Sequence, residues 1–184
     1  MDKIIAAVRD TNELKCALDS KAENIFMLST NIEELKGQIE LVHNRGKRLF
    51  VHIDLADGIG KDEYGIKYVK GLGVDGIIST RVNMIKLAKR YEINTVQRFF
   101  IVDSHSVKTT IDTARAAKPD MIEIMPGTVS KIIKKLKTEL DMPIVAGGLI
   151  FHQLHNAGNA DNLIILITAL FFHQSANGYY MGIF

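Results

Sequence analysis

The sequence has 184 residues, with 23 Lys and Arg against 21 Asp and Glu, for a formal net charge of +2. A chain of this length forms one domain with a sizeable core, since two domains of ordinary size need about 200 residues or more. Hydrophobic residues make up 47% and charged residues 24% of the chain, which excludes disordered, collagen-like and coiled-coil proteins. The balanced charge argues against an overall basic nucleic-acid-binding protein but is compatible with a local basic patch.

The cysteine content and the chain start indicate the compartment. Cys16 is the single cysteine, so no intramolecular disulfide forms, as is usual in a reducing compartment. Arg9 and Asp10 come before any hydrophobic region of a signal peptide. The longest apolar run, 163–172, is about half the roughly 20 residues that a membrane-spanning helix needs. We therefore expect a cytoplasmic protein with no membrane partner.

Short apolar runs rich in β-branched and aromatic residues recur at a steady interval. They cover residues 4–8, 24–29, 49–54, 76–80, 95–102, 121–125 and 143–146, and their starts lie about 23 residues apart. Gly, Asp, Asn or Pro bounds most of these runs, as strands require. Apolar residues at three- and four-residue spacing predict helices between them, for example over 31–43, 65–72, 83–91, 107–117 and 128–140.

The alternation of strands and helices predicts the fold class. Near-continuous apolar strands separated by helices are typical of a parallel α/β sheet covered by helices. An eighth strand is due at 162–170, where the sequence NLIILITAL is apolar. Eight units favour a compact (β/α)₈ TIM-type barrel in a single domain over 1–184, although only spacing and apolarity support the eighth strand. A flavodoxin-like doubly wound sheet is the alternative, but it needs only five strands.

The third predicted strand carries the first candidate site residues, because function in a barrel lies at the carboxyl ends of strands. Asp54 shares one strand face with His52, so its carboxylate is expected near a ligand pocket. In the glycine-rich loop that follows, Lys61 offers a positive charge to a phosphate. The alternative is a solvated loop in which Asp62 caps the next helix.

Other strand ends carry groups suited to a hydroxylated or anionic ligand. Thr80 and Asp103 follow the fourth and fifth strands, and each can either bind a ligand or cap the next helix. Gly147 and Gly148 follow the seventh strand, where many barrels bind a phosphate on backbone N–H groups. We therefore expect these strand ends to contribute to one ligand pocket.

Two charged residues stand inside apolar strands. Arg98 lies in the fifth strand and Glu123 in the sixth. A buried charge without a partner is costly, and neighbouring strands would bring the two together, so we predict a buried Arg98–Glu123 pair. The pair is either a structural ion pair or a polar platform for a ligand.

Sequence motifs of several site types are absent. There is no Walker A loop, no G-x-G-x-x-G after a strand and no cysteine pair for zinc. We therefore assign no catalytic residue, metal ligand or cofactor. Lys131, Lys134 and Lys135 share one face of the helix after the sixth strand. They form either a solvated surface or a contact for nucleic-acid phosphates.

Five segments together resemble the glycerol uptake operon antiterminator regulatory proteins of bacteria. They are HIDLADGIGKDEYGIKYV (52–69), DGIISTR (75–81), TVQRFFIVDS (95–104), PDMIEIMPG (119–127) and PIVAGGLI (143–150). The resemblance runs from about Ile4 to Ile150 and implies a compact (β/α)₈ barrel. It also implies a non-enzymatic regulator with glycerol 3-phosphate as effector, no cofactor and the leader mRNA of a glycerol-metabolism operon as partner. Association into a homo-oligomer is compatible with it.

Within the matching motifs, the strand-end residues are carried as ligand-pocket candidates. They are Asp54, Lys61, Asp62, Thr80, Arg98, Asp103, Glu123, Gly147 and Gly148. After Ile150 the sequence departs from the family, which continues with an acidic amphipathic helix, a Ser/Thr-rich eighth strand end and a tryptophan. This chain has no tryptophan, so we predict that 151–184 is an atypical or frameshifted segment. Resequencing the coding DNA tests the reading frame.

Two other functions stay open from the residues alone. The first is a phosphosugar-type barrel enzyme, an isomerase or lyase, with Asp54, Asp103 or Glu123 as acid and base groups. The second is a degenerate barrel that binds its ligand but has lost its regulatory output through the altered tail.

Overall fold

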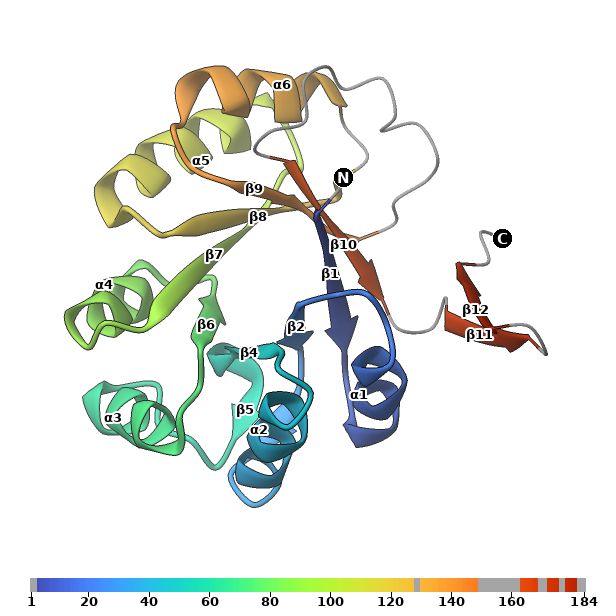
Figure 1. Cartoon of the computed structure of the whole chain (residues 1–184). Coiled ribbons are helices and arrows are strands. Elements are labelled where there is room, and N and C mark those ends of the chain that lie inside the picture. Colours follow the sequence, from blue (N-terminus) through green and yellow to red (C-terminus); the bar gives the residue numbers. More distant parts are fainter. Residues whose placement is uncertain (1–2, 128–129, 149–162, 169–171, 176–177, 182–184) are drawn as a thin grey trace.

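A closed barrel of parallel strands forms the centre of the molecule (Figure 1). The computed structural model describes residues 3–127, 130–148, 163–168, 172–175 and 178–181. Within these residues the barrel has eight strands, which neighbour one another in the order of the chain. They are β1 (Lys3–Val8), β2 (Asn24–Met27), β4 (Arg48–His52), β6 (Gly76–Ser79), β7 (Asn94–Phe100), β8 (Met121–Met125), β9 (Ile144–Ala146) and β10 (Leu163–Thr168). Strand β10 pairs with both β9 and β1 and so closes the barrel.

Within the described residues, helices follow six of the eight barrel strands and lie on the outside of the barrel (Figure 1). They are α1 (Thr11–Leu18), α2 (Leu35–His43), α3 (Glu63–Leu72), α4 (Val82–Arg90), α5 (Ser104–Ala117) and α6 (Ser130–Glu139). A 3₁₀ turn, η1 (Ile53–Leu55), follows β4. Two short strand pairs lie outside the barrel: β3 (Thr30–Asn31) with β5 (Ala56–Asp57), and β11 (Phe172–Ser175) with β12 (Gly178–Met181). None of the helices in the described ranges is long and apolar enough to cross a membrane.

Side chains alternate along the strands between two hydrophobic layers, because the side-chain period of a strand is two. Phe26, Phe50, Ile78, Val96 and Val145 pack together inside the barrel, and the rings of Phe26 and Phe50 lie 5.3 Å apart. Alternate residues of the barrel strands pack outward against the helices, among them Ile25, Val51, Ile77, Ile122 and Ile144. These inward residues fill the barrel below the carboxyl ends of the strands. Only side chains further along the strands therefore reach the open carboxyl-terminal end of the barrel.

Gly76 shows how closely the barrel interior is packed. A Cβ atom at this position would lie 2.3 Å from Cδ1 of Phe50, which is the direct cross-strand neighbour of Gly76. Such a distance is far inside van der Waals contact, so only glycine leaves room for the Phe50 ring. The interior is thus a packed core of the TIM-barrel type and not a pore.

The predicted barrel is confirmed, including a strand within 162–170. The closed sheet also rules out the flavodoxin-like alternative, whose sheet is open. Some boundaries differ from the prediction: the third strand ends at His52, the fifth ends at Phe100, and the helix expected from residue 31 begins at Leu35. Helix α1 was not among the predicted helices. The departure predicted from residue 151 falls partly on 151–162, outside the described residues, and the single-domain assignment over 1–184 stays a prediction.

Candidate ligand-binding site

The predicted pair of Arg98 and Glu123 lies buried between β7 and β8. The two residues are direct cross-strand partners, and Nε of Arg98 donates to Oε2 of Glu123 over 2.8 Å. Their side chains are 8% and 0% exposed. Arg98 lies two residues beyond the interior residue Val96, so it points into the barrel above the apolar core. The pair thus places a charged platform at the carboxyl end of the barrel interior.

The contact with Arg98 uses only one of the two carboxylate oxygens of Glu123. Its second carboxylate oxygen, Oε1, is buried and has no hydrogen-bond partner in the part of the chain that the structure describes. Burial raises the pKa of Glu123 above its ordinary value, and the positive charge of Arg98 opposes that rise. The carboxylate therefore keeps one acceptor available to another molecule.

His52 joins this platform from the end of β4. It is 4% exposed, and neither ring nitrogen has a partner among the described residues. Burial, together with the charge of Arg98, lowers the pKa of His52 to about 4, although Asp54 opposes this. The imidazole is therefore neutral near pH 7. The sequence interpretation did not include His52 among the site residues, although its place on the face of Asp54 was an available signal.

Asp54 links two neighbouring loops at the barrel mouth. From η1 it accepts hydrogen bonds from Oγ of Ser79 at 2.8 Å and from the backbone N and Oγ1 of Thr80 at 2.8 and 2.9 Å. Nε of Arg81 lies 3.8 Å from its Oδ1. Burial raises the pKa of Asp54, but the hydrogen bonds from Thr80 and Ser79 outweigh burial and lower it. Asp54 and Thr80 thus contact each other and fix the rim of the site.

We expect Asp54→Asn to lower the free energy of unfolding by about 1 to 3 kcal/mol, because an amide group replaces one oxygen that accepts from Thr80. Urea denaturation at pH 7 measures the loss. Asp57→Asn is the matched control, since Asp57 is an exposed carboxylate in the same loop. Equal stability of the two variants would contradict a linking role for Asp54.

Lys61 and Asp62 stabilise the loop after β5. Nζ of Lys61 donates to the carbonyl oxygens of Ala56 and Ile59, and burial lowers its pKa. Asp62 caps α3 by accepting from the backbone N of Gly65 at 2.9 Å, as the alternative interpretation expected. In this structure both side chains act on their own loop, and a ligand contact for either stays a prediction.

Asp103 lies apart from the buried platform and caps α5. It is exposed, and it forms a reciprocal capping box with Ser106, whose backbone N lies 2.7 Å from its Oδ1. The backbone hydrogen bond from Ser106 lowers the pKa of Asp103. Asp103 therefore contributes to the entrance of a groove between α5 and α6 and does not meet Arg98 and Glu123.

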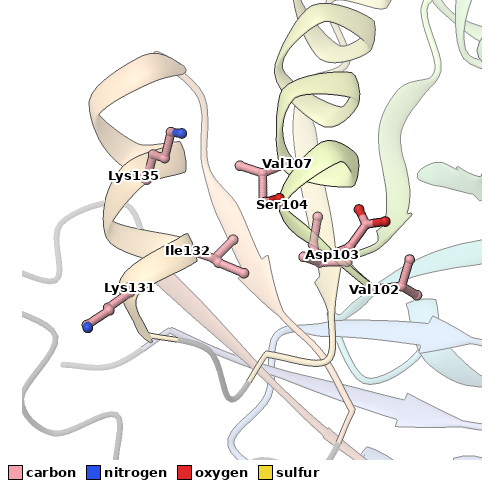
Figure 2. Close-up of a pocket in the computed structure, with 8 residues that line it drawn as sticks. Val102, Asp103, Ser104, Val107, Lys131, Ile132 and Lys135 are labelled. Atoms are coloured by element: carbon pink, nitrogen blue, oxygen red, sulfur yellow. The ribbon is translucent and has the colours of Figure 1, made fainter.

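This α5–α6 groove has a volume of about 480 Å³. Figure 2 shows Val107 and Ile132 on the facing sides of the two helices, with Lys131 and Lys135 extending from α6. The residues that line it are Ile101, Val102, Asp103, Ser104, Val107, Lys131, Ile132 and Lys135. Val102 is 84% exposed, and Phe100 at the end of β7 is 56% exposed. The groove thus joins an apolar floor to two exposed lysines.

Gly147 and Gly148 follow β9, next to the strand that carries Glu123. The backbone N of Gly147 donates to the carbonyl oxygen of Ile124 over 2.9 Å. Gly148 has a φ of +87°, a conformation that a residue with a Cβ rarely adopts. The backbone at Gly147 therefore lies against β8, the strand that carries Glu123, and a phosphate contact for the two glycines stays a prediction.

The comparison with protein families decides the family of this chain. The model of the family described as "Glycerol-3-phosphate responsive antiterminator" matches residues 4–163. The chain belongs to this antiterminator family. The match continues past Ile150, where the resemblance was expected to end, and reaches the first residue of β10. The limit drawn at Ile150 was therefore wrong, because the tail lacks the conspicuous motifs of the earlier segments.

Individual relatives agree with the family assignment. The Escherichia coli protein YgcP is 36% identical over 160 residues, which cover 86% of this chain and 83% of that protein. The glycerol uptake operon antiterminator regulatory protein of Listeria monocytogenes has 31% identity and a TM-score of 0.82, with 91% of each chain covered. The antiterminator-related protein of Thermotoga maritima has 28% identity and a TM-score of 0.77, with 91% and 94% covered.

Barrel enzymes share the fold of the antiterminator family but not its sequence. Orotidine 5′-monophosphate decarboxylase of Methanocaldococcus jannaschii has a TM-score of 0.66 at 17% identity, with 96% of this chain and 93% of that chain covered. The likeness shows a TIM-type fold alone, since one fold hosts many functions. Among the described residues of this chain, no group of three or more His, Cys, Asp or Glu side chains is placed to hold a metal ion.

Proposed function

We propose that this protein is a glycerol 3-phosphate-responsive antiterminator that binds the leader mRNA of a glycerol-metabolism operon. The family match over residues 4–163 carries the proposal. The buried platform of Arg98 and Glu123 supports it, because a small hydroxylated anion needs both a positive charge and hydrogen-bond acceptors. Binding without chemical change is the expected outcome, in the cytoplasm and without a cofactor.

The effector would lie over Arg98 and Glu123 at the carboxyl ends of β7 and β8. Gly148 would offer its backbone N–H to the phosphate, as residues after the seventh strand do in many barrels, whereas the N–H of Gly147 already donates to Ile124. Asp54, Thr80, Lys61 and Asp62 would hold the loops around it, and Asp103 would support the groove at the α5 entrance.

The enzyme alternative is less well supported by the placement of its carboxylates. Asp54 accepts three hydrogen bonds from Ser79 and Thr80, and Asp103 caps α5. Glu123 is paired with Arg98. Asp54 and Asp103 thus already make structural contacts, whereas general acid–base catalysis needs a group within reach of a substrate proton.

Binding of the protein to a labelled leader RNA from a glycerol operon tests the proposal. We expect glycerol 3-phosphate to change the RNA affinity by about tenfold or more, the range of a typical allosteric coupling. An RNA of equal length and shuffled sequence is the control. RNA binding that ignores glycerol 3-phosphate, or an absence of sequence preference, would count against the function as proposed.

Lys131 and Lys135 beside the α5–α6 groove are the residues we expect to contact RNA phosphates. Replacing both by alanine should reduce the salt slope of RNA binding by about 1.4, from about 0.7 for each lost contact to a single strand. Lys36→Ala with Lys86→Ala is the matched control, since both lysines are exposed on the other helices α2 and α4. Equal slopes for the two double variants would place the RNA elsewhere.

A further inference from the structure

Three buried polar atoms that have no hydrogen-bond partner among the described residues lie at one place inside the barrel. They are both ring nitrogens of His52 and Oε1 of Glu123. Arg98 connects the two residues: its Nε binds Glu123, and its charge acts on His52. Gln97 and Asn24 also carry such atoms. However, Gln97 lies on the opposite strand face from Arg98, and Asn24 begins β2 at the other end of the barrel.

Such a cluster is unusual in a folded protein. Buried polar side-chain atoms nearly always have a hydrogen-bond partner, since leaving one unpaired costs free energy. His52 and Glu123 are 4% and 0% exposed, so bulk water does not satisfy them. Three unpaired atoms around one paired arginine therefore indicate that another molecule completes the hydrogen bonding.

The chemistry of the three atoms restricts what that molecule can present. A neutral imidazole offers one N–H donor and one acceptor, and the carboxylate Oε1 of Glu123 only accepts. Phosphate oxygens also accept and carry negative charge, so they are poor partners for Glu123. Hydroxyl groups both donate and accept, and they match His52 and Glu123 together.

We propose that His52 and Glu123 bind the hydroxyl end of a polyol phosphate and select hydroxyl over carbonyl groups. This inference rests on the proposed function, because it orients glycerol 3-phosphate within the barrel. The hydroxyls point down toward His52 and Glu123, and the phosphate points out toward Gly147 and Gly148. Nε of Arg98 binds Oε2 of Glu123, so Oε1 is the oxygen left to face the ligand, and the charge of Arg98 opposes the rise that burial causes in the pKa of Glu123.

This orientation predicts discrimination between two ligands of almost equal size and charge. Dihydroxyacetone phosphate has a carbonyl in place of the central hydroxyl. Its carbonyl oxygen accepts hydrogen bonds and cannot donate one to Oε1 of Glu123, which is also an acceptor. Sites built to hydrogen-bond a substrate hydroxyl reject analogues that lack it very strongly. We expect glycerol 3-phosphate to bind at least about 100-fold more tightly than dihydroxyacetone phosphate.

Titration calorimetry with the full chain tests the orientation, using glycerol 3-phosphate, dihydroxyacetone phosphate and inorganic phosphate as probes. Glu123→Gln keeps an acceptor for Arg98 and presents an N–H group, so the preference for glycerol 3-phosphate should fall by about tenfold or more. His52→Phe should weaken glycerol 3-phosphate and leave inorganic phosphate unchanged. Lys36→Ala on the distant helix α2 is the control and should keep all three affinities.

The outcomes separate the orientation from the proposed function. If the wild type prefers glycerol 3-phosphate and both variants keep that preference, the orientation is overturned while the function stands, and ordered water fills the cluster. If the wild type binds neither organic phosphate, the function fails and the orientation with it. Thermal unfolding checks that each variant folds. If Glu123→Gln does not fold, the affinities of His52→Phe for glycerol 3-phosphate and inorganic phosphate test the orientation alone.

Discussion

Arg98→Met is expected to lower the free energy of unfolding by about 3 to 5 kcal/mol at pH 7, the usual cost of removing one partner from a buried ion pair. Glu123 is fully buried and accepts from Arg98 over 2.8 Å, so the variant leaves a buried carboxylate without its counter-charge. Urea denaturation of the two proteins measures the difference. A loss below about 1 kcal/mol would place the pair in a solvated environment, since exposed ion pairs contribute no more than that.

The double variant Arg98→Met with Glu123→Leu is the informative control. Apolar residues of similar volume often replace a buried pair without loss, so the double variant should regain much of the stability that Arg98→Met loses. A double variant as unstable as the single one would show that packing, and not the stranded charge, causes the loss.

The deficit of Arg98→Met should also depend on pH. Burial raises the pKa of Glu123, and Arg98 opposes the rise, so removing Arg98 raises this pKa further. A carboxyl group with a raised pKa in the folded state binds more protons there than in the unfolded state, so its stability contribution falls as pH increases. The deficit should therefore be smallest below the ordinary glutamate pKa of 4.5 and grow toward neutral pH.

His52 gives the second large effect, an acid-induced loss of stability. Its pKa falls from the ordinary 6.5 to about 4 in the folded state, so the unfolded state binds the proton first. The folded protein should lose about 3 kcal/mol through this residue as pH falls from 6.5 to 4, at 1.36 kcal/mol for each pKa unit. The contribution is complete above pH 6.5 and absent below about 4.

The difference between wild type and His52→Phe isolates this effect from the carboxyl groups that titrate in the same range. Unfolding free energies measured between pH 4 and 7.5 should converge or cross as the pH falls, because phenylalanine cannot take up a proton. His105→Phe is the matched control for the loss of an imidazole, since His105 is exposed on α5. A parallel curve for His52→Phe would contradict the buried, neutral imidazole.

Local patterns in the sequence were sufficient for the barrel. A strand about every 23 residues, bounded by turn formers and followed by an amphipathic helix, permits few topologies, and eight such units favour closure. The same regularity located the strand ends and so the candidates Asp54, Thr80, Arg98 and Glu123. It also predicted the Arg98–Glu123 pair, because consecutive strands of a parallel barrel are neighbours.

The roles of those side chains depended on contacts that no local pattern contains. Asp54 was expected to face the ligand but accepts from Thr80 of the next loop, and Asp103 caps its own helix. His52 was passed over because a histidine at a strand end looks the same in sequence whether exposed or buried. Its burial follows from the closure of the sheet around it.

The sequence by itself therefore determined the fold class and the family resemblance, and it predicted the end of the barrel at which the candidate site lies. Only the tertiary structure decided that His52 and Oε1 of Glu123 are buried without hydrogen-bond partners among the described residues, and that Asp54 and Lys61 hold loops. The physical reason is that periodicity and turn propensity act over a few residues of one chain segment. Burial, hydrogen bonding and pKa, in contrast, depend on which distant segments surround a group once the eight strands have closed.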